Sequence, residues 1–317
     1  MVLTVAVLMD PIESLHIEKD TTFALLLEAQ RRGHRLQYLT QKSLAVRDAA
    51  PRAHAQHLQV RDNARGWFTL DAAQWLDLRE VDVILARKDP PFDGQFLYDT
   101  MVLELAQRAG VLVVNDPQGL RDANEKLFSL HFPQCIPPTM VAREAAEIRH
   151  FVAEHGEVVI KPLDGMGGRA IFRSAHGDPN LNVIIETLTD NGRNFAAVQR
   201  FIKEISAGDK RILMIDGVPV PYALARIPQG DDFRGNLARG GKGVGMPLTE
   251  RERWIAAQVG PELSRRGMLF VGLDVIGDYL TEVNVTSPTC ARELDAQFGL
   301  NIAGQLFDVI EAKRGSR

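Results

Sequence analysis

Three side chains that carry oxygen ligands lie close together near the C-terminal end of the sequence. Asp274, Glu282 and Asn284 stand within apolar segments that a turn at Gly277-Asp278 joins. Oxygen ligands of this kind suit Mg²⁺, which binds carboxylates together with the phosphates of a nucleotide. Acidic groups among Val, Leu and Ile are costly to bury without a partner. A metal site is therefore preferred to a strand that merely has one polar face.

The length of this turn decides whether the three side chains meet. Strand side chains alternate in direction, so Glu282 and Asn284 share one face. A two-residue turn would pair Asp274 with Thr281 and send Glu282 to the opposite face. A three-residue turn, extended by Tyr279, would set Asp274 opposite Glu282. The metal site requires the three-residue turn.

A lysine followed by glycines forms a second candidate site. In Lys161-Pro-Leu-Asp-Gly-Met-Gly-Gly168 the lysine ends an expected strand, and Gly165, Gly167 and Gly168 lie in the turn after it. Glycines let backbone N–H groups approach phosphate oxygens, and the lysine adds a positive charge. The segment lacks the Gly-Lys-Ser/Thr ending of a P-loop. Taken alone, so short a motif is more often a plain hairpin turn with a solvated lysine.

The stretch from Arg226 to Gly243 combines many glycines with four cations, Arg234 among them. This composition predicts a loop without a stable element. The loop either closes over an anionic site and excludes water, or it is a surface loop with solvated charges. The sequence favours neither alternative over the other.

Other charged residues are weaker candidates when each is taken by itself. Lys126 could bind a phosphate or simply be solvated. Arg87 follows a buried strand, at the end where ligands bind in α/β sheets, or else lies in a rigid surface turn. Arg211 lies next to an apolar strand and would need an anionic partner if buried.

Composition excludes several classes of protein. The 317 residues are 45% apolar and 25% charged, as in an ordinary globular protein, and the net charge of -4 gives no reason to expect nucleic acid or an anionic membrane as partner. Cys135 and Cys290 form no metal-ligand pair, which fits a reducing cytosol. The apolar run Val2–Met9 is too short for a membrane span. We expect a cytoplasmic protein.

The first third of the chain alternates strands and helices, which predicts a parallel, doubly wound α/β sheet. Its first strand leads into Met9-Asp10-Pro11-Ile12 rather than a dinucleotide-binding glycine turn. The expected strands are Val2–Leu8, Arg35–Leu39, Val81–Leu85 and Val111–Val114, and the expected helices are Thr22–Arg32 and Phe96–Ala109.

Prolines at 133, 137 and 138 mark a boundary, beyond which hairpins with flanking helices predict antiparallel α+β modules. Asp216-Gly217 signals a hairpin, and Thr249 with Glu252 forms a capping box that opens a helix to about Arg266. The expected strands are Val158–Lys161, Ala170–Arg173, Ala196–Phe201, Arg211–Ile215 and Tyr222–Arg226, and the expected helices include Glu144–His155 and Leu181–Thr189.

Taken in order, these segments resemble the prokaryotic-type glutathione synthetase family of the ATP-grasp superfamily. The resemblance implies an N-terminal α/β substrate domain (1–123), an ATP-grasp lid (124–200) and a C-terminal antiparallel α+β catalytic domain (201–317), with ATP between the last two. The segments that carry it are Leu25–Gly33, Arg87–Asp93, Asn124–Lys126, Lys161–Gly168, Ala225–Gly230 and Thr281–Thr289.

The resemblance also implies a role for each candidate residue. Lys126, Lys161 and the turn of Gly165, Gly167 and Gly168 would bind ATP phosphates, and Gln199 would lie near the adenine. Asp274, Glu282 and Asn284 would hold Mg²⁺, with Mn²⁺ as an alternative. The remaining roles are Arg211 and Arg226 at the transferred phosphoryl group and substrate carboxylate, Arg234 on a closing loop, and Arg87, Ser287 and Thr289 at the substrates.

The implied reaction is the ATP-dependent joining of γ-glutamylcysteine to glycine through an acyl phosphate, by a homo-oligomer, plausibly a tetramer. Another ATP-grasp ligase, joining D-alanines or adding glutamate, would have a similar ATP site. A non-catalytic nucleotide-binding protein would not need the full set of lysines, arginines and carboxylates. An NAD-dependent enzyme is disfavoured by the missing glycine fingerprint.

Overall fold

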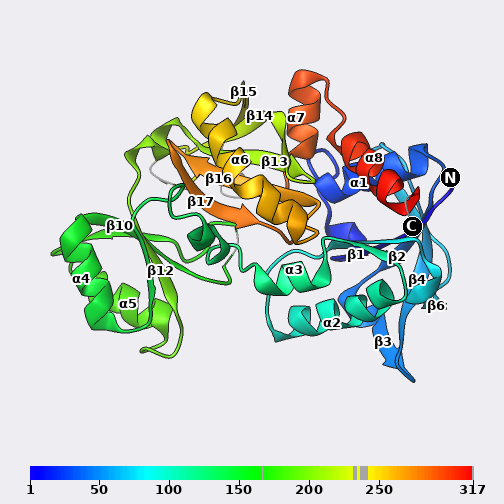
Figure 1. Cartoon of the computed structure of the whole chain (residues 1–317), viewed down its shortest axis with the longest axis horizontal. Coiled ribbons are helices and arrows are strands. Elements are labelled where there is room, and N and C mark those ends of the chain that lie inside the picture. The colour runs from blue at the N-terminus through cyan, green and yellow to red at the C-terminus, as the bar shows by residue number, and fades with distance from the viewer. Residues whose placement is uncertain (166, 231–233, 236–241, 316–317) are drawn as a thin grey trace.

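The computed structural model describes residues 1–165, 167–230, 234–235 and 242–315. Its strands form three sheets that follow one another along the chain (Figure 1). The first is an eight-stranded mixed sheet, the second has four antiparallel strands, and the third has five antiparallel strands. None of the described helices combines the length and the hydropathy needed to cross a membrane.

The centre of the first sheet is parallel, and helices cover both of its faces. In the central strand, Val5 and Val7 pack in the same core as helix α1, whereas Ala6 and Leu8 pack in the core that α2 covers. This alternation confirms the predicted doubly wound arrangement. The parallel strands are β1 (Thr4–Met9), β2 (Arg35–Leu39), β7 (Val83–Arg87) and β8 (Leu112–Val114), and the helices are α1 (Thr21–Arg31), α2 (Gly94–Arg108) and α3 (Pro117–Asp122).

An antiparallel extension of this sheet was not predicted. The long strand β4 pairs with β2 through its second half and carries three further strands. It is rich in Ala, His and Gln rather than in β-branched residues, so its composition does not indicate a strand. The extension consists of β3 (Leu44–Arg47), β4 (Ala50–Val60), β5 (Phe68–Leu70) and β6 (Gln74–Asp77).

The second sheet forms a separate small layer with two helices on one face (Figure 1). Ile148 and Val152 of α4 and Ile185 of α5 pack against Ile160 and Val198 of the sheet. The sheet has the order β11-β10-β12-β9, and its elements are β9 (Thr139–Ala142), α4 (Ala145–His155), β10 (Glu157–Pro162), β11 (Phe172–Ala175), α5 (Leu181–Thr189) and β12 (Ala196–Arg200).

The third sheet has the order β15-β14-β13-β16-β17. Its first hairpin turns at Asp216-Gly217, and helix α6 opens with a capping box of Thr249 and Glu252, both as predicted. The elements are β13 (Asp209–Ile215), β14 (Val218–Ile227), β15 (Lys242–Pro247), α6 (Glu250–Arg265), β16 (Phe270–Ile276), β17 (Tyr279–Asn284), α7 (Ala291–Phe298) and α8 (Ile302–Gly315).

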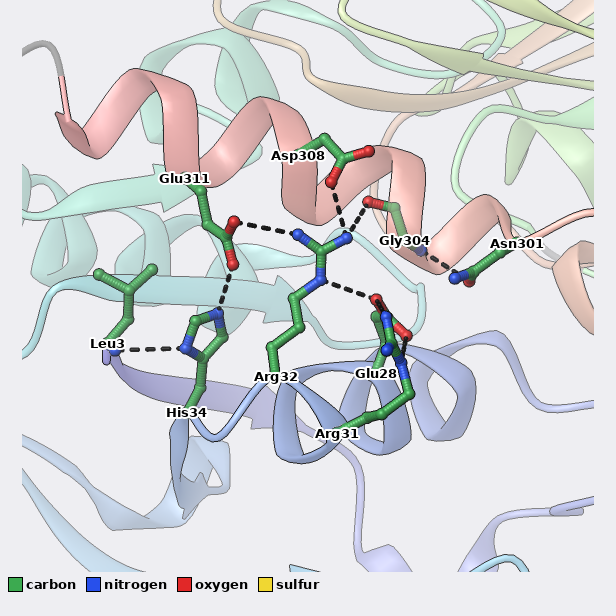
Figure 2. Close-up of polar contacts among 9 residues, drawn as sticks. All are labelled: Leu3, Glu28, Arg31, Arg32, His34, Asn301, Gly304, Asp308 and Glu311. Carbon is green, nitrogen blue, oxygen red and sulfur yellow. Dashed lines mark hydrogen bonds and ion pairs between the residues drawn. The ribbon is translucent and has the colours of Figure 1, made fainter. Parts of the chain in front are cut away.

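The last helix returns to the first domain and packs along α1 (Figure 1). Figure 2 shows the polar contacts between them, which centre on the guanidinium of Arg32. Its Nε bonds the Glu28 carboxylate at 2.7 Å, its Nη2 bonds Asp308 at 2.7 Å, and its Nη1 bonds Glu311 at 3.0 Å. The amide of Leu3 donates to Nδ1 of the buried His34, so Nε2 carries the proton that bonds Glu311.

Candidate active site

A cavity of about 210 Å³ opens where the three sheets meet. A neighbouring cavity of about 100 Å³ shares Lys161, Asp274 and Glu282 with it and adds Gln199 and Arg234. The larger cavity is lined by cationic side chains together with the carboxylates of Asp274 and Glu282, and this combination suits a polyanion bound with a metal. The predicted site residues that line the larger cavity are Lys126, Lys161, Gly165, Gly167, Gly168, Arg211, Arg226, Asp274, Glu282, Asn284, Ser287 and Thr289.

The hairpin of β16 and β17 brings the acidic residues together by a different route from the one predicted. Ile276 pairs with Tyr279, so the turn has two residues, and the expectation of a three-residue turn is wrong. Asp274 nevertheless faces Glu282, because a β-bulge at Thr281 shifts the register by one residue. The Thr281 hydroxyl donates to the Asp274 carbonyl oxygen at 3.1 Å and so stabilises the bulge.

The two predicted phosphate lysines line the larger cavity together with Glu282. Lys126 Nζ is 3.1 Å from Glu282 Oε1 and donates to the Gly165 carbonyl at 2.8 Å. Burial alone would lower the pKa of Lys126, but Glu282 and Glu125 raise it above its usual value. Burial lowers the pKa of Lys161, a shift that Glu282 opposes. Both lysines therefore depend on nearby negative charge to remain protonated.

Two arginines and two aspartates form a buried cluster beside the lysines. Arg211 contacts both oxygens of Asp274, at 2.5 and 3.1 Å, and Arg226 Nη2 lies 2.8 Å from Asp274 Oδ2. Burial favours the neutral form of Asp274, but the two arginines hold the pKa of its carboxyl well below the usual range. The same Arg226 group bonds Asp209 at 2.5 Å.

Asp209 is a site residue that the sequence analysis did not name. Burial raises the pKa of Asp209 to about 6, and Arg226 opposes that shift. Its Oδ1 is buried and, among the described residues, has no hydrogen-bond partner. A signal was present in the sequence, because an acidic residue opens the same strand that carries Arg211.

The oxygen ligands fit a magnesium ion that completes its sphere with phosphate and water. Glu282 and Asn284 line the larger cavity from one face of β17. Asn284 uses its amide N–H₂ on the Gly272 carbonyl, so its oxygen is the atom that it offers to a cation. No three His, Cys, Asp or Glu side chains of the described residues gather to hold a metal by themselves. Asp274 would have to exchange an arginine contact to become a ligand.

The glycine turn lies beside Lys126 and the predicted closing loop. Gly167 and Gly168 have φ of +60° and +74°, a conformation that favours glycine. Arg234 Nη1 donates to the Gly168 carbonyl at 2.7 Å, which joins this turn to the loop after β14. Met166 and residues 231–233 and 236–241 lie outside the described residues.

The prediction that the stretch from Arg226 to Gly243 forms no stable element is wrong for Lys242 and Gly243, whereas Arg226 lies in a strand as the expected range Tyr222–Arg226 predicts. Arg226 and Ile227 complete β14, and Lys242 begins β15. The register pairs Ile227 with Lys242, so the two strands close the base of the loop. β15 contains glycines at positions 243 and 245, which are unfavourable in a strand and hide it in the sequence.

Gln199 lies on β12 and lines the smaller cavity. Its Nε2 donates to Thr139 Oγ1 at 3.2 Å. Phe201, Ile202 and Ile205 line the same cavity and give it an apolar wall. An apolar wall next to cationic side chains such as Lys161 suits a purine ring whose phosphates are bound by those cations.

Arg87 is buried and lines neither cavity. Its Nε donates to Thr22 Oγ1 at 3.1 Å, and its Nη2 donates to the Pro288 carbonyl at 2.9 Å. Burial lowers the pKa of Arg87 to about 10, against the effect of Asp20 and Asp89. Arg87 therefore contacts the segment that carries Ser287 and Thr289, and it is this segment that lines the larger cavity.

Solved structures show which fold these sheets make. The structure of the D-cycloserine synthetase DcsG superposes with a TM-score of 0.66 at 15% identity, covering 96% of this chain and 99% of that one. The ATP-grasp ligase PsnB, complexed with a precursor peptide and AMPPNP, gives a TM-score of 0.62 at 14% identity, covering 98% and 97%. At such identities the likeness establishes the fold, which is that of ATP-grasp ligases.

Family models and relatives cover nearly the whole chain. Residues 3–121 match the prokaryotic glutathione synthetase N-terminal domain, and residues 125–299 match the prokaryotic glutathione synthetase ATP-grasp domain. The glutathione synthetase of Xanthomonas axonopodis pv. citri is 67% identical over 98% of this chain and 99% of its own. That of Pseudomonas aeruginosa is 56% identical over the full length of both. The chain belongs to the prokaryotic glutathione synthetase family, within the ATP-grasp superfamily.

Proposed function

We propose that the protein joins γ-glutamylcysteine to glycine at the expense of ATP, giving glutathione, ADP and phosphate. The observation that carries the proposal is the single cavity in which Lys126, Lys161, Arg211 and Arg226 surround Glu282 and Asp274. A binding protein would not need arginines at the end of a nucleotide site. The relatives named glutathione synthetase, identical at more than half of their positions, support this choice of substrates.

The reaction needs two steps because a carboxylate is a poor electrophile. An oxygen of the cysteinyl carboxylate attacks the γ-phosphorus of ATP, the bond to the β-phosphate oxygen breaks, and ADP leaves. The amine of glycine then attacks the acyl carbon, the carbon–oxygen bond to phosphate breaks, and the amine loses a proton. No side chain becomes a covalent nucleophile, so the protein supplies positioning and charge neutralisation.

The charges of the site are placed for these steps. Lys126 and Lys161 bind the phosphates of ATP, and the turn of Gly165, Gly167 and Gly168 covers them. Gln199 lies near the adenine. Arg211 and Arg226 face the transferred phosphoryl group and the substrate carboxylate, Arg234 belongs to the closing loop, and Ser287 and Thr289, backed by Arg87, lie at the acceptor end.

Glu282, Asn284 and, after exchange of an arginine contact, Asp274 would hold Mg²⁺. When bound, the ion neutralises the charge that develops on the phosphates. The water-sensitive acyl phosphate gives the loop that carries Arg234 a purpose, since a closed loop excludes water. In the same proposal the chain has domains of 1–123, 124–200 and 201–317, acts in the cytoplasm and assembles as a homo-oligomer such as a tetramer.

The test is ADP release by the purified protein with ATP, Mg²⁺, γ-glutamylcysteine and glycine, each omitted in turn. We expect release only with all four present, and glutathione as the product. Release with D-alanine or glutamate as the amine, but not with glycine, would keep the ATP-grasp fold and reject the substrates. No release with any carboxylate and amine would reject the enzyme.

A further inference from the structure

The segment that follows β17 is held by side chains from a distant part of the chain. Residues 285–288 lead to the predicted acceptor end, whose polar groups are Ser287 and Thr289. Asn115 Nδ2 donates to the Val285 carbonyl at 2.7 Å, and Arg87 Nη2 donates to the Pro288 carbonyl at 2.9 Å. Both holders lie in the first domain, which is remote in sequence.

Glu125 makes the densest set of these contacts. Its Oε1 accepts hydrogen bonds from the Val285 amide at 3.0 Å, the Thr286 amide at 3.2 Å and the Thr286 hydroxyl at 2.9 Å. Its own main-chain carbonyl accepts from the Val283 amide at 2.9 Å. One carboxylate oxygen thus orients two consecutive peptide planes at the point where the chain leaves the sheet.

The surroundings of Glu125 are costly for a carboxylate. The side chain lines the larger cavity beside Lys126, and the like charge of Glu282 acts on it. Burial raises the pKa of Glu125, and the like charge of Glu282 adds to that rise. Burial of the Glu125 carboxylate is costly, but its Oε1 accepts three hydrogen bonds. An apolar side chain at this position would leave those three donors without an acceptor.

We propose that Glu125 is a positioning residue, whose Oε1 sets the path of residues 285–288 and thereby places Ser287 and Thr289 at the acceptor end of the cavity. What that end binds rests on the proposed function. The geometric part of the inference, that Glu125 holds the segment, is independent of the substrates. The hydrogen bonds, rather than the negative charge, carry the role.

Two substitutions separate the effect of the Glu125 hydrogen bonds from the effect of its negative charge. Glu125→Ala removes the acceptor but leaves the backbone bond from Val283 in place. Glu125→Gln keeps an acceptor oxygen and removes the charge. We expect Glu125→Ala to raise KM for γ-glutamylcysteine or glycine about tenfold or more, as the loss of a buried hydrogen-bond acceptor implies, with KM for ATP within about twofold. Glu125→Gln should stay within about threefold of the unmodified protein.

A control and a second variant make the result specific. Glu28→Ala removes another buried carboxylate, on α1. It should lower thermal stability without changing KM for glycine or for γ-glutamylcysteine. Thr286→Val removes only the hydroxyl donor to Glu125 and should show a smaller change in the same KM values as Glu125→Ala. If Glu125→Ala does not fold, Thr286→Val and Glu125→Gln still test the bond.

Amide hydrogen exchange tests the positioning without any substrate. The amides of Val285 and Thr286 should exchange about tenfold faster or more in Glu125→Ala, while those of β16 remain protected. Unchanged exchange would overturn the inference even if the protein makes glutathione. Faster exchange in a protein that makes no glutathione would reject the proposed function instead. Loss of activity in Glu125→Gln equal to that in Glu125→Ala would show that the charge matters and reject the hydrogen-bonding role.

Discussion

At the scale of single residues, two carboxylates on the cavity wall already face cations. Glu282 contacts Lys126, and Asp274 contacts Arg211 and Arg226. A nucleotide and its metal would enter by exchange of partners, with phosphate taking the lysine and the metal taking the carboxylate. Before the substrates bind, these ion pairs lower the cost of holding the five charged groups in the buried site.

The metal-binding role is tested by Glu282→Gln combined with Asn284→Ala. We expect ADP release to fall by about 100-fold or more and the residual rate to need more Mg²⁺, because the site loses its charged and amide oxygen ligands. The measurement is ADP release over a series of Mg²⁺ concentrations. Glu262→Gln, on the surface of α6, is the control and should behave like the unmodified protein. Near-native ligation at ordinary Mg²⁺ would contradict the assignment.

The residue types and their alternation along the strand were enough to place Glu282 and Asn284 on one face. The bulge that adds Asp274 was not predictable, because Thr281 is an ordinary strand residue and its bond to the Asp274 carbonyl appears only in three dimensions. The location of Arg87 behind Pro288 was equally hidden, since it depends on a contact across two domains.

At the scale of elements, Arg32 joins α1 to α8. Arg32→Met keeps the aliphatic part of the side chain but leaves the carboxylates of Glu28, Asp308 and Glu311 without this partner. We expect the free energy of unfolding to fall by about 1–3 kcal/mol, as for other charged hydrogen bonds. Chemical denaturation is the measurement, with Arg193→Met, whose one ion pair is exposed, as the control. Equal stability of the two variants would show that the network contributes nothing.

Glu28 makes the same pair of helices sensitive to acid. Its hydrogen bond from Arg31, together with Arg32, lowers the pKa of Glu28 to about 2, while burial opposes the shift. A lowered pKa stabilises the folded state above the unfolded value near 4.5 and loses that stabilisation as pH falls towards 2. Glu28→Gln should therefore cost about 1–2 kcal/mol at neutral pH, after allowance for screening by solvent, and progressively less below pH 4.5. Urea denaturation between pH 3 and 7 measures the difference, and a constant difference would contradict it.

Elements with strong periodicity or clear end signals were predicted closely. The bounds of β2 and α5 match the expected ranges, and Thr249 caps the N-terminus of α6. Among the strands that escaped prediction, β4 and β15 carry Ala, His, Gln or Gly and are held in the sheets by their neighbours. For them tertiary pairing outweighs local preference.

At the scale of the whole molecule, each of the three sheets contributes to the cavity, so a nucleotide should stabilise all of them together. ATP analogue with Mg²⁺ at one hundred times its Kd should stabilise the folded state by about 2.7 kcal/mol and raise Tm. Lys161→Ala, which removes a lysine common to both cavities, should abolish most of the rise, whereas Lys42→Ala, an exposed lysine of the first domain, should not. Thermal unfolding with and without the analogue measures the rise in Tm of each variant. An unchanged rise in Lys161→Ala would place the nucleotide elsewhere.

The bonds from Asn115 and Arg87 to residues 285–288 mean that residues 124–317 do not by themselves hold the segment proposed as the acceptor end. A chimaera that takes its first 123 residues from one relative and the remainder from another should retain its peptide affinity only if both parents present the same donors to this segment. In evolutionary terms, we expect the two halves to constrain each other as a matched pair rather than to act as interchangeable modules.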